Sequence, residues 1–255
     1  IDGEPSIDVW AMDVARFGDY ASPQYGTIKS SENYERRFIM TFPNETLPKG
    51  RKQKTTTLYD RFVNQGAVMG DSFGLENVLW FANNKEDAHE EPTIKRSRSH
   101  DYVSKEVINV RENVGLIEVA NFSKHEFKGP DARKFLDHIM AGRLPKPGRI
   151  SLSPMLSYRG KLCGDLTVAC LDENEFMVFG SGAAQEMHRR WFESHLDKFN
   201  LSYSNRSDEY HGLSIAGPNS RKVLEKIVRD DVSNEKFKFR DSRRMFVGGV
   251  PAIIN

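Results

Sequence analysis

The stretch Phe127-Lys-Gly-Pro-Asp-Ala-Arg-Lys-Phe-Leu-Asp-His-Ile139 decides the fold, because it returns later as Ile215-Ala-Gly-Pro-Asn-Ser-Arg-Lys-Val-Leu-Glu-Lys-Ile227. In each copy an apolar residue that can end a strand leads into Gly-Pro and then into apolar residues at helical spacing. Asp131 and Asn219 stand where a side chain can cap the first free amides of a helix. The chain therefore carries one strand-turn-helix unit twice, and small ligands often bind in the crevice between such neighbours.

The rest of the pattern predicts an α+β protein. The buried helix faces are expected to consist of Phe135, Leu136, Ile139 and Met140 in the first copy and of Val223, Leu224, Ile227 and Val228 in the second. Strands are expected over 116–120 and 122–128, then over 149–157, 161–171 and 175–180 as an antiparallel meander, with a last hairpin turning at Gly248-Gly249. Helices are expected over 29–38, 57–65, 101–112 and 183–199, the last with Met187, Trp191 and Leu196 facing inward, and residues 67–81 as a buried loop or short strand.

Composition narrows the classes of protein to consider. The 255 residues include 37 basic and 36 acidic side chains, and this balance gives no electrostatic reason to expect a nucleic-acid or membrane partner. No apolar run approaches the ~20 residues of a membrane helix. Cys163 and Cys170 lie on one expected strand with side chains on opposite faces, so they are not expected to pair. We therefore expect a soluble protein of the cytoplasm, or of the mitochondrial matrix if the source is a eukaryote.

The ends of the chain and one polar segment indicate its organisation. The chain starts at Ile1 and stops inside an apolar run that reaches Ile254, as a piece of a longer polypeptide would. Residues 83–99 are polar, with Pro92 in the middle, and are the best linker candidate. We therefore expect two domains, 1–92 and 93–255.

Few residues carry recognisable chemistry. The Gly180-Ser-Gly182 segment lacks the third glycine of a dinucleotide loop. His188 and His195 share a helix face without a third ligand, so no metal site is expected. Asp165 lies in an apolar run that predicts a half-buried strand, where a charge is costly unless it is paired. It is either a solvated residue at the start of the strand or an acid-base group.

Several motifs, in order, resemble one family. Asn113-Val-Gly-Leu-Ile-Glu-Val-Ala-Asn-Phe-Ser-Lys, Phe127-Lys-Gly-Pro-Asp-Ala, Ser153-Pro-Met-Leu-Ser157 and Gly164-Asp-Leu-Thr-Val168 resemble successive motifs of the glycine-cleavage T-protein, or aminomethyltransferase, family. Upstream, Gly18-Asp-Tyr20, Leu58-Tyr-Asp-Arg61 and Gly70-Asp-Ser-Phe-Gly-Leu-Glu76 resemble the middle segment of dimethylglycine and sarcosine dehydrogenases. In those enzymes this segment joins an FAD-binding domain to a T-protein-like folate domain.

The resemblance implies a T-protein-like folate-binding fold preceded by a small dehydrogenase middle segment. It implies that an upstream FAD domain, outside this chain, oxidises an N-methylated amine to its iminium. Tetrahydrofolate then captures the one-carbon unit as 5,10-methylenetetrahydrofolate. The family's essential aspartate falls on Asp165, and the implied folate contacts are Leu152, Met155, Asp165 and Phe179. Leu152 stands where many T-proteins have tyrosine, and the family's Tyr-Thr-Gly-Glu-like segment would follow Asn255.

Two other functions are compatible with the same resemblance. One is a non-catalytic folate-binding module, like the T-protein-fold factor of iron-sulfur assembly, although that factor's Lys-Gly-Cys-Tyr-x-Gly-Gln motif is absent from this sequence. The other is a folate-dependent demethylase that transfers a methyl group directly. The absent motif argues against the first alternative, and the dehydrogenase-like segment at residues 18–81 disfavours the second.

Overall fold

The computed structural model describes residues 9–43 and 45–255. The chain divides into two compact units, one ending at Glu112 and the other beginning at Asn113. The boundary expected at residues 92 and 93 falls within the first unit. Among the described residues, no helix combines the length and the apolar character that crossing a membrane requires.

The first unit begins with short helices. Two 3-10 turns, η1 (Trp10–Met12) and η2 (Val14–Phe17), precede α1 (Pro23–Glu35) and later α2 (Tyr59–Asn64). Helix α1 starts earlier than the expected 29–38 because Ser22 caps it. The Ser22 hydroxyl accepts a hydrogen bond from the Tyr25 amide at 3.2 Å, and Pro23 occupies the first helical position. The short helix expected over 57–65 is confirmed as α2.

A β-hairpin completes the core of this unit. Strands β1 (Ala67–Ser72) and β2 (Leu75–Phe81) pair antiparallel, so the buried loop or single short strand expected over 67–81 is wrong. The turn is made by Phe73 and Gly74, both with positive φ, of 51° and 80°, as a tight two-residue hairpin requires. Helix α3 (Ser99–Glu112) packs on β2, with the Tyr102 ring 5.0 Å from that of Trp80.

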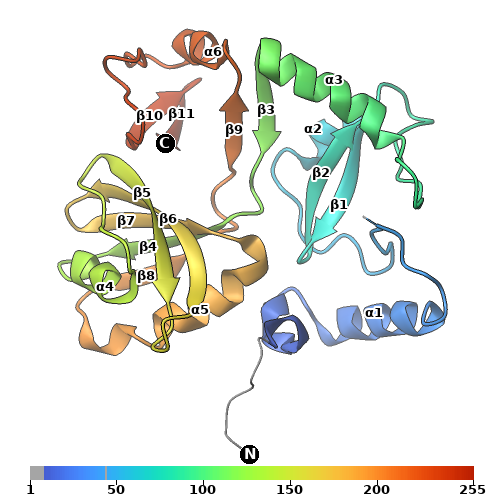
Figure 1. Cartoon of the computed structure of the whole chain (residues 1–255), viewed down its shortest axis with the longest axis horizontal. Coiled ribbons are helices and arrows are strands. Elements are labelled where there is room, and N and C mark those ends of the chain that lie inside the picture. The colour runs from blue at the N-terminus through green and yellow to red at the C-terminus, as the bar shows by residue number, and fades with distance from the viewer. Residues whose placement is uncertain (1–8, 44) are drawn as a thin grey trace, which may run out of the picture. The chain divides into compact units, whose positions relative to one another are not determined.

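The second unit is built on a five-stranded antiparallel sheet with strand order β5-β6-β7-β4-β8 (Figure 1). Its strands are β4 (Ser123–Lys128), β5 (Arg149–Leu156), β6 (Leu162–Asp172), β7 (Glu175–Gly180) and β8 (Ser202–Asn205). The expected meander is therefore confirmed as β5, β6 and β7. The sequence-distant β4 lies between β7 and β8, so the strand of the first repeat has a neighbour on both sides.

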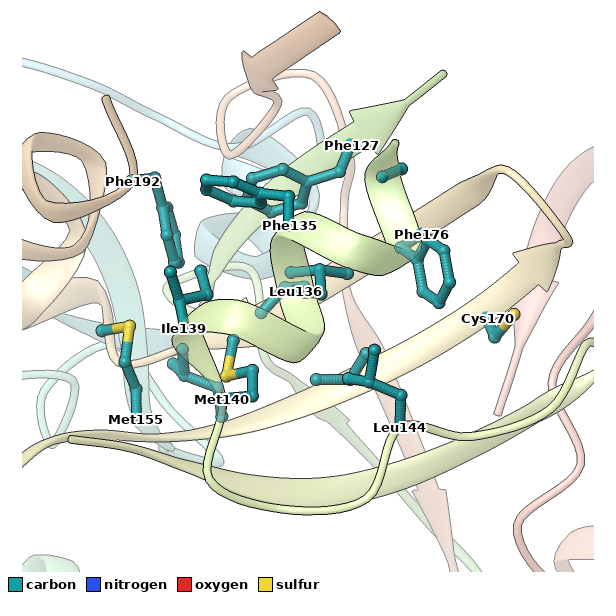
Figure 2. Close-up of a cluster of buried hydrophobic side chains, with 14 residues drawn as sticks. Phe127, Phe135, Leu136, Ile139, Met140, Leu144, Met155, Cys170, Phe176 and Phe192 are labelled. Carbon is teal, nitrogen blue, oxygen red and sulfur yellow. The ribbon is translucent and has the colours of Figure 1, made fainter. Parts of the chain in front are cut away.

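Two helices cover one face of this sheet. Helix α4 (Ala132–Ile139) follows β4, and α5 (Gln185–Glu193) follows β7, flanked by the 3-10 turns η3 (Gly182–Ala184) and η4 (Leu196–Lys198). The face predicted for the first repeat helix is confirmed, since Phe135, Leu136, Ile139 and Met140 are all buried among the strands (Figure 2). On α5 the most buried side chains are His188 and Phe192, whereas Met187, Trp191 and Leu196 are only half-buried.

The second repeat has the same local geometry with less burial. Strand β9 (Leu213–Ala216) pairs with β3 (Gly115–Glu118), α6 (Ser220–Ile227) follows, and β10 (Arg243–Val247) and β11 (Val250–Ile254) form the expected last hairpin. Of its predicted buried face, only Val228 is buried, while Ile227 is 44% exposed. That expectation is wrong for Ile227, because α6 packs against a two-stranded hairpin and lacks the broad sheet that α4 covers.

The capping role expected for Asp131 and Asn219 is also wrong. Neither side chain bonds the amides of the following helix, because both residues adopt φ near −100° and ψ near 5° and lack the extended conformation of a capping residue. Their backbone carbonyls begin the helices instead, accepting from Phe135 at 2.9 Å and from Val223 at 3.2 Å. The Asp131 carboxylate binds the Asn200 amide and Lys134.

Candidate functional site

Asp165 lies on the face of the five-stranded sheet opposite helices α4 and α5. Along β6 its neighbour Leu166 points into the core with no exposed surface, and alternate residues of a strand face opposite sides. Asp165 pairs across the sheet with Pro154 of β5 and is exposed. Within the described part of the chain its carboxylate has no hydrogen-bond or ion-pair partner. The expectation of a half-buried, paired charge is thus wrong, because this end of the strand is open to solvent.

The residues around Asp165 form a mostly apolar patch, which we call the open patch. It consists of Leu152, Pro154, Asp165, Thr167 and Phe179, which the strand register places on one face, since Leu152 pairs with Thr167 and Thr167 with Phe179. Leu152 is 65% exposed. Further along β6 the same face closes, and Ala169 has no exposed surface. The open patch is therefore a mostly apolar surface with a carboxylate at its edge, on the uncovered end of a sheet.

Met155 is the one predicted contact that lies elsewhere. It follows Pro154 on β5, so its side chain points to the opposite face, where it is fully buried in the α4 core. Its terminal methyl lies close to the backbone of Gly164 beneath the strand. The structure thus brings Leu152, Asp165 and Phe179 together and separates Met155 from them. As placed, Met155 can support the open patch from below without touching a ligand on it.

Lys124 borders the open patch and was not singled out in the sequence. It pairs with Phe179 across the β4–β7 ladder and is 3% exposed. Burial lowers the pKa of its ammonium group to about 8. The ammonium group donates to the carbonyls of Ala120 and Phe122 at 2.9 and 2.6 Å. The signal available in the sequence is a lysine inside a strand next to the repeat, which a solvated face explains equally well.

The two histidines of the α5 region do not meet. His188 is buried against His125, with ring centroids 6.3 Å apart, whereas the half-buried His195 lies against His138 at 6.2 Å. Among the described residues no group of three possible metal ligands is present. Cys163 and Cys170 are both free thiols, and burial raises the pKa of each.

Comparison with known proteins assigns the chain to a family. Residues 58–255 match the model of the GCVT N-terminal domain. The chain belongs to the GCVT family. Residues 2–56 match the FAD dependent oxidoreductase central domain, so the GCVT chain also carries the middle segment of a flavoprotein oxidoreductase. The two models meet between residues 56 and 58, whereas the compact units divide after Glu112.

Individual relatives show the same combination. Human mitochondrial dimethylglycine dehydrogenase is 32% identical over 253 residues, which cover 98% of this chain and 29% of that protein. Human mitochondrial sarcosine dehydrogenase is 25% identical over 98% of the chain and 32% of that protein. An aminomethyltransferase of Staphylococcus epidermidis is 28% identical over 76% of the chain and 49% of that protein. The GCVT chain thus spans about a third of the length of the dehydrogenases and about half of the length of the aminomethyltransferase.

The fold agrees with the family. Aminomethyltransferase T of the glycine cleavage system from Bartonella henselae superposes with a TM-score of 0.61 at 21% identity, over 75% of this chain and 47% of that protein. At this identity the likeness establishes the fold, which is the predicted T-protein-like arrangement of helices and sheet. The motifs around the Gly-Pro turns, Ser153 and Asp165 thus led to the correct family.

Proposed function

We propose that this chain is the tetrahydrofolate-dependent one-carbon transfer module of a dimethylglycine or sarcosine dehydrogenase-like flavoenzyme. The observation that carries the proposal is the unpartnered carboxylate of Asp165 at the edge of the open patch. Under this proposal residues 1–92 are the dehydrogenase-like middle segment and linker, and residues 93–255 are the folate domain. An FAD domain of the same polypeptide would supply the iminium of an N-methylated amine.

The open patch fits the chemistry of a reduced pterin. Leu152 offers an exposed apolar surface, and Phe179 adds an aromatic side chain, against which a flat heterocycle can lie. An ionised aspartate accepts hydrogen bonds and donates none, and a pterin presents N–H donors along its edge. A ligand lying across Leu152, Thr167 and Phe179 would have Asp165 at its edge, two residues further along β6. A donor on that edge would satisfy a carboxylate that has no partner within the described residues.

Asp165 would then act as an acid-base group and stabilise positive charge. Tetrahydrofolate supplies the nitrogens that accept the one-carbon unit as 5,10-methylenetetrahydrofolate. A carboxylate beside these nitrogens stabilises cationic character and takes or orients a proton, and a positioned acid-base group contributes on the order of 10²–10⁴ in rate. Lys124 stands two strands away with its ammonium held by backbone carbonyls, so we assign it no proton transfer.

The relatives also indicate a location. The human dehydrogenases that match nearly the whole chain are named as mitochondrial proteins. We therefore extend the proposal to the mitochondrial matrix if the source organism is a eukaryote, and to the cytoplasm if it is not.

The test separates amine oxidation from one-carbon capture. In the natural protein, Asp165→Asn keeps the shape of the side chain and removes its charge. We expect formation of 5,10-methylenetetrahydrofolate from dimethylglycine or sarcosine to fall about 10²–10⁴-fold, while amine oxidation continues and releases formaldehyde. The control is Asp172→Asn, an exposed aspartate at the far end of the same strand. An unchanged yield in Asp165→Asn would remove this residue from the mechanism, and folate binding without any turnover in the wild type would favour the non-catalytic module.

A further inference from the structure

The part of β6 that carries Asp165 has a neighbouring strand on one side only. Residues 162–166 pair with β5, whereas the ladder between β6 and β7 begins at Thr167 and Phe179. Strand β7 ends at Gly180, and the chain then turns into η3 and α5. A strand segment bonded on one side holds its side chains less firmly than one inside a sheet. The position of Asp165 therefore depends on which group lies beside β6 beyond the end of β7.

His188 of α5 occupies that place. Its side chain is 2% exposed, and its Nε2 lies 3.3 Å from the carbonyl oxygen of Cys163 on β6. A carbonyl can only accept, so Nε2 carries the proton. Burial lowers the pKa of His188 below its ordinary value, which keeps the ring neutral with the lone pair on Nδ1. The imidazole thus supplies the hydrogen bond that a neighbouring strand would otherwise make.

Two glycines make room for this ring. A Cβ at Gly164 would come within 2.8 Å of His188 Nε2, and a Cβ at Gly180 within 3.0 Å of His188 Nδ1. Gly164 directly precedes Asp165 on β6, and Gly180 is the last residue of β7. A larger residue at Gly164 would meet the imidazole first, whereas one at Gly180 would meet Leu166 at 2.6 Å as well as the imidazole. The ring is therefore held in a slot that opens on the backbone next to Asp165.

We propose that His188 is a positioning residue for Asp165, holding the one-sided end of β6 in place through its hydrogen bond to Cys163. This role rests on the proposed function, because it matters for turnover only if Asp165 acts there. His188 itself lies on the core face and touches no ligand on the open patch.

A matched pair of variants tests the hydrogen bond. In the natural protein, His188→Gln retains an N–H donor close to the position of Nε2, whereas His188→Met fills a similar volume without a donor. Since a misplacement of about 1 Å can cost about 10²-fold, we expect His188→Met to lower kcat for methylenetetrahydrofolate formation by about 10–100-fold. Under the same reasoning His188→Gln should stay within about fivefold of the wild type. Equal kcat values for the two variants would overturn the proposal.

Two further measurements separate positioning from a general loss of structure. Phe192→Leu weakens the same helix in the same core without touching the bond to Cys163, and we expect its kcat to stay near that of the wild type. Hydrogen-deuterium exchange of the peptide covering residues 160–168 should accelerate in His188→Met and not in His188→Gln. Unchanged exchange in both would contradict the proposed support of β6.

Gly164→Ala is a second route to the same displacement, because His188 is the nearest side chain to the added methyl. We expect it to lower kcat in the wild type and to cost little more in His188→Ala, where the slot is empty. Asp165→Asn distinguishes the two proposals. If that variant keeps full activity, the proposed function of Asp165 fails. If it is inactive while His188→Met is fully active, only the positioning role of His188 fails.

Discussion

The most quantitative expectation concerns His125, whose imidazole is buried in the core of the second unit. It lies on β4 with no exposed surface, beside the Phe192 ring at 5.0 Å. Its Nδ1 lies 2.9 Å from the hydroxyl of Tyr203 on β8. Burial, together with the nearby His188 and Lys124, lowers the pKa of His125 to about 3. The native state therefore holds a histidine that stays neutral well below pH 6.

The sign and the size of the effect follow from proton linkage. Unfolding returns the pKa of His125 to its ordinary value of 6.5, so the unfolded chain binds a proton that the folded chain does not. The contribution of the neutral ring to stability is complete above that pH and is lost as the pH falls toward about 3. The loss is about 1.4 kcal/mol per pH unit. Between pH 6.5 and pH 4.5 it amounts to about 2.3 kcal/mol, because the unfolded histidine is only half protonated at pH 6.5.

The assay is urea unfolding followed by tryptophan fluorescence at several pH values, for the wild type and for His125→Phe. Phenylalanine fits a site already lined by Phe127 and Phe192 and cannot titrate. Its loss of the Tyr203 hydrogen bond changes stability by an amount independent of pH in this range. We expect the wild type to lose about 2.3 kcal/mol more than the variant between pH 6.5 and pH 4.5. Parallel stability curves would refute the argument that burial keeps His125 neutral.

Two further expectations concern packing and a buried ion pair. Leu136→Ala leaves a cavity at a fully buried position of the α4 core and should lower the free energy of unfolding by about 2–5 kcal/mol. Leu152→Ala on the open patch should lower it by less than about 1 kcal/mol. Similar losses for the two variants would mean that the open patch is covered. The buried carboxylate of Glu76, 1% exposed, accepts a hydrogen bond from the Arg51 guanidinium at 2.8 Å. Arg51→Met removes this partner and should lower the free energy of unfolding of the first unit, measured in urea, by about 3–5 kcal/mol. Lys49→Met, at an exposed ion pair, should cost less than about 1 kcal/mol; equal losses would contradict the importance of burial at Glu76.

The sequence predicted those features that depend on local chemistry. The Gly-Pro turns, the buried face with Phe135 and Ile139, and the Gly248-Gly249 hairpin follow from short-range geometry and apolar spacing, and all are present. The α1 start was missed because the Ser22-Pro23 cap precedes a stretch with little apolar periodicity. The family motifs placed Asp165 on a strand, but its exposure depends on where the ladder between β6 and β7 ends, and no local pattern carries that information.

The site residues show the same division. Leu152, Asp165 and Phe179 share a face because of a register that joins three strands, and Met155 is excluded by the alternation of side chains along a single strand. The alternation was readable in the sequence: Leu152 and Met155 are three residues apart on one expected strand, so their side chains point to opposite faces. His188 was not readable in this way, because its role comes from two glycines and a carbonyl on strands far from it in sequence.

The two repeats show why a motif predicts local geometry better than burial. In both copies the glycine before proline has a positive φ, of 135° at Gly129 and 114° at Gly217. The residue after each helix forms a bridge to a strand, Met140 to Met155 and Val228 to Val247. The surroundings differ, because α4 lies on a five-stranded sheet whereas α6 meets a hairpin. Burial of a helix face is therefore set by the width of the sheet beneath it, which explains why one apolar pattern is buried at Ile139 and exposed at Ile227.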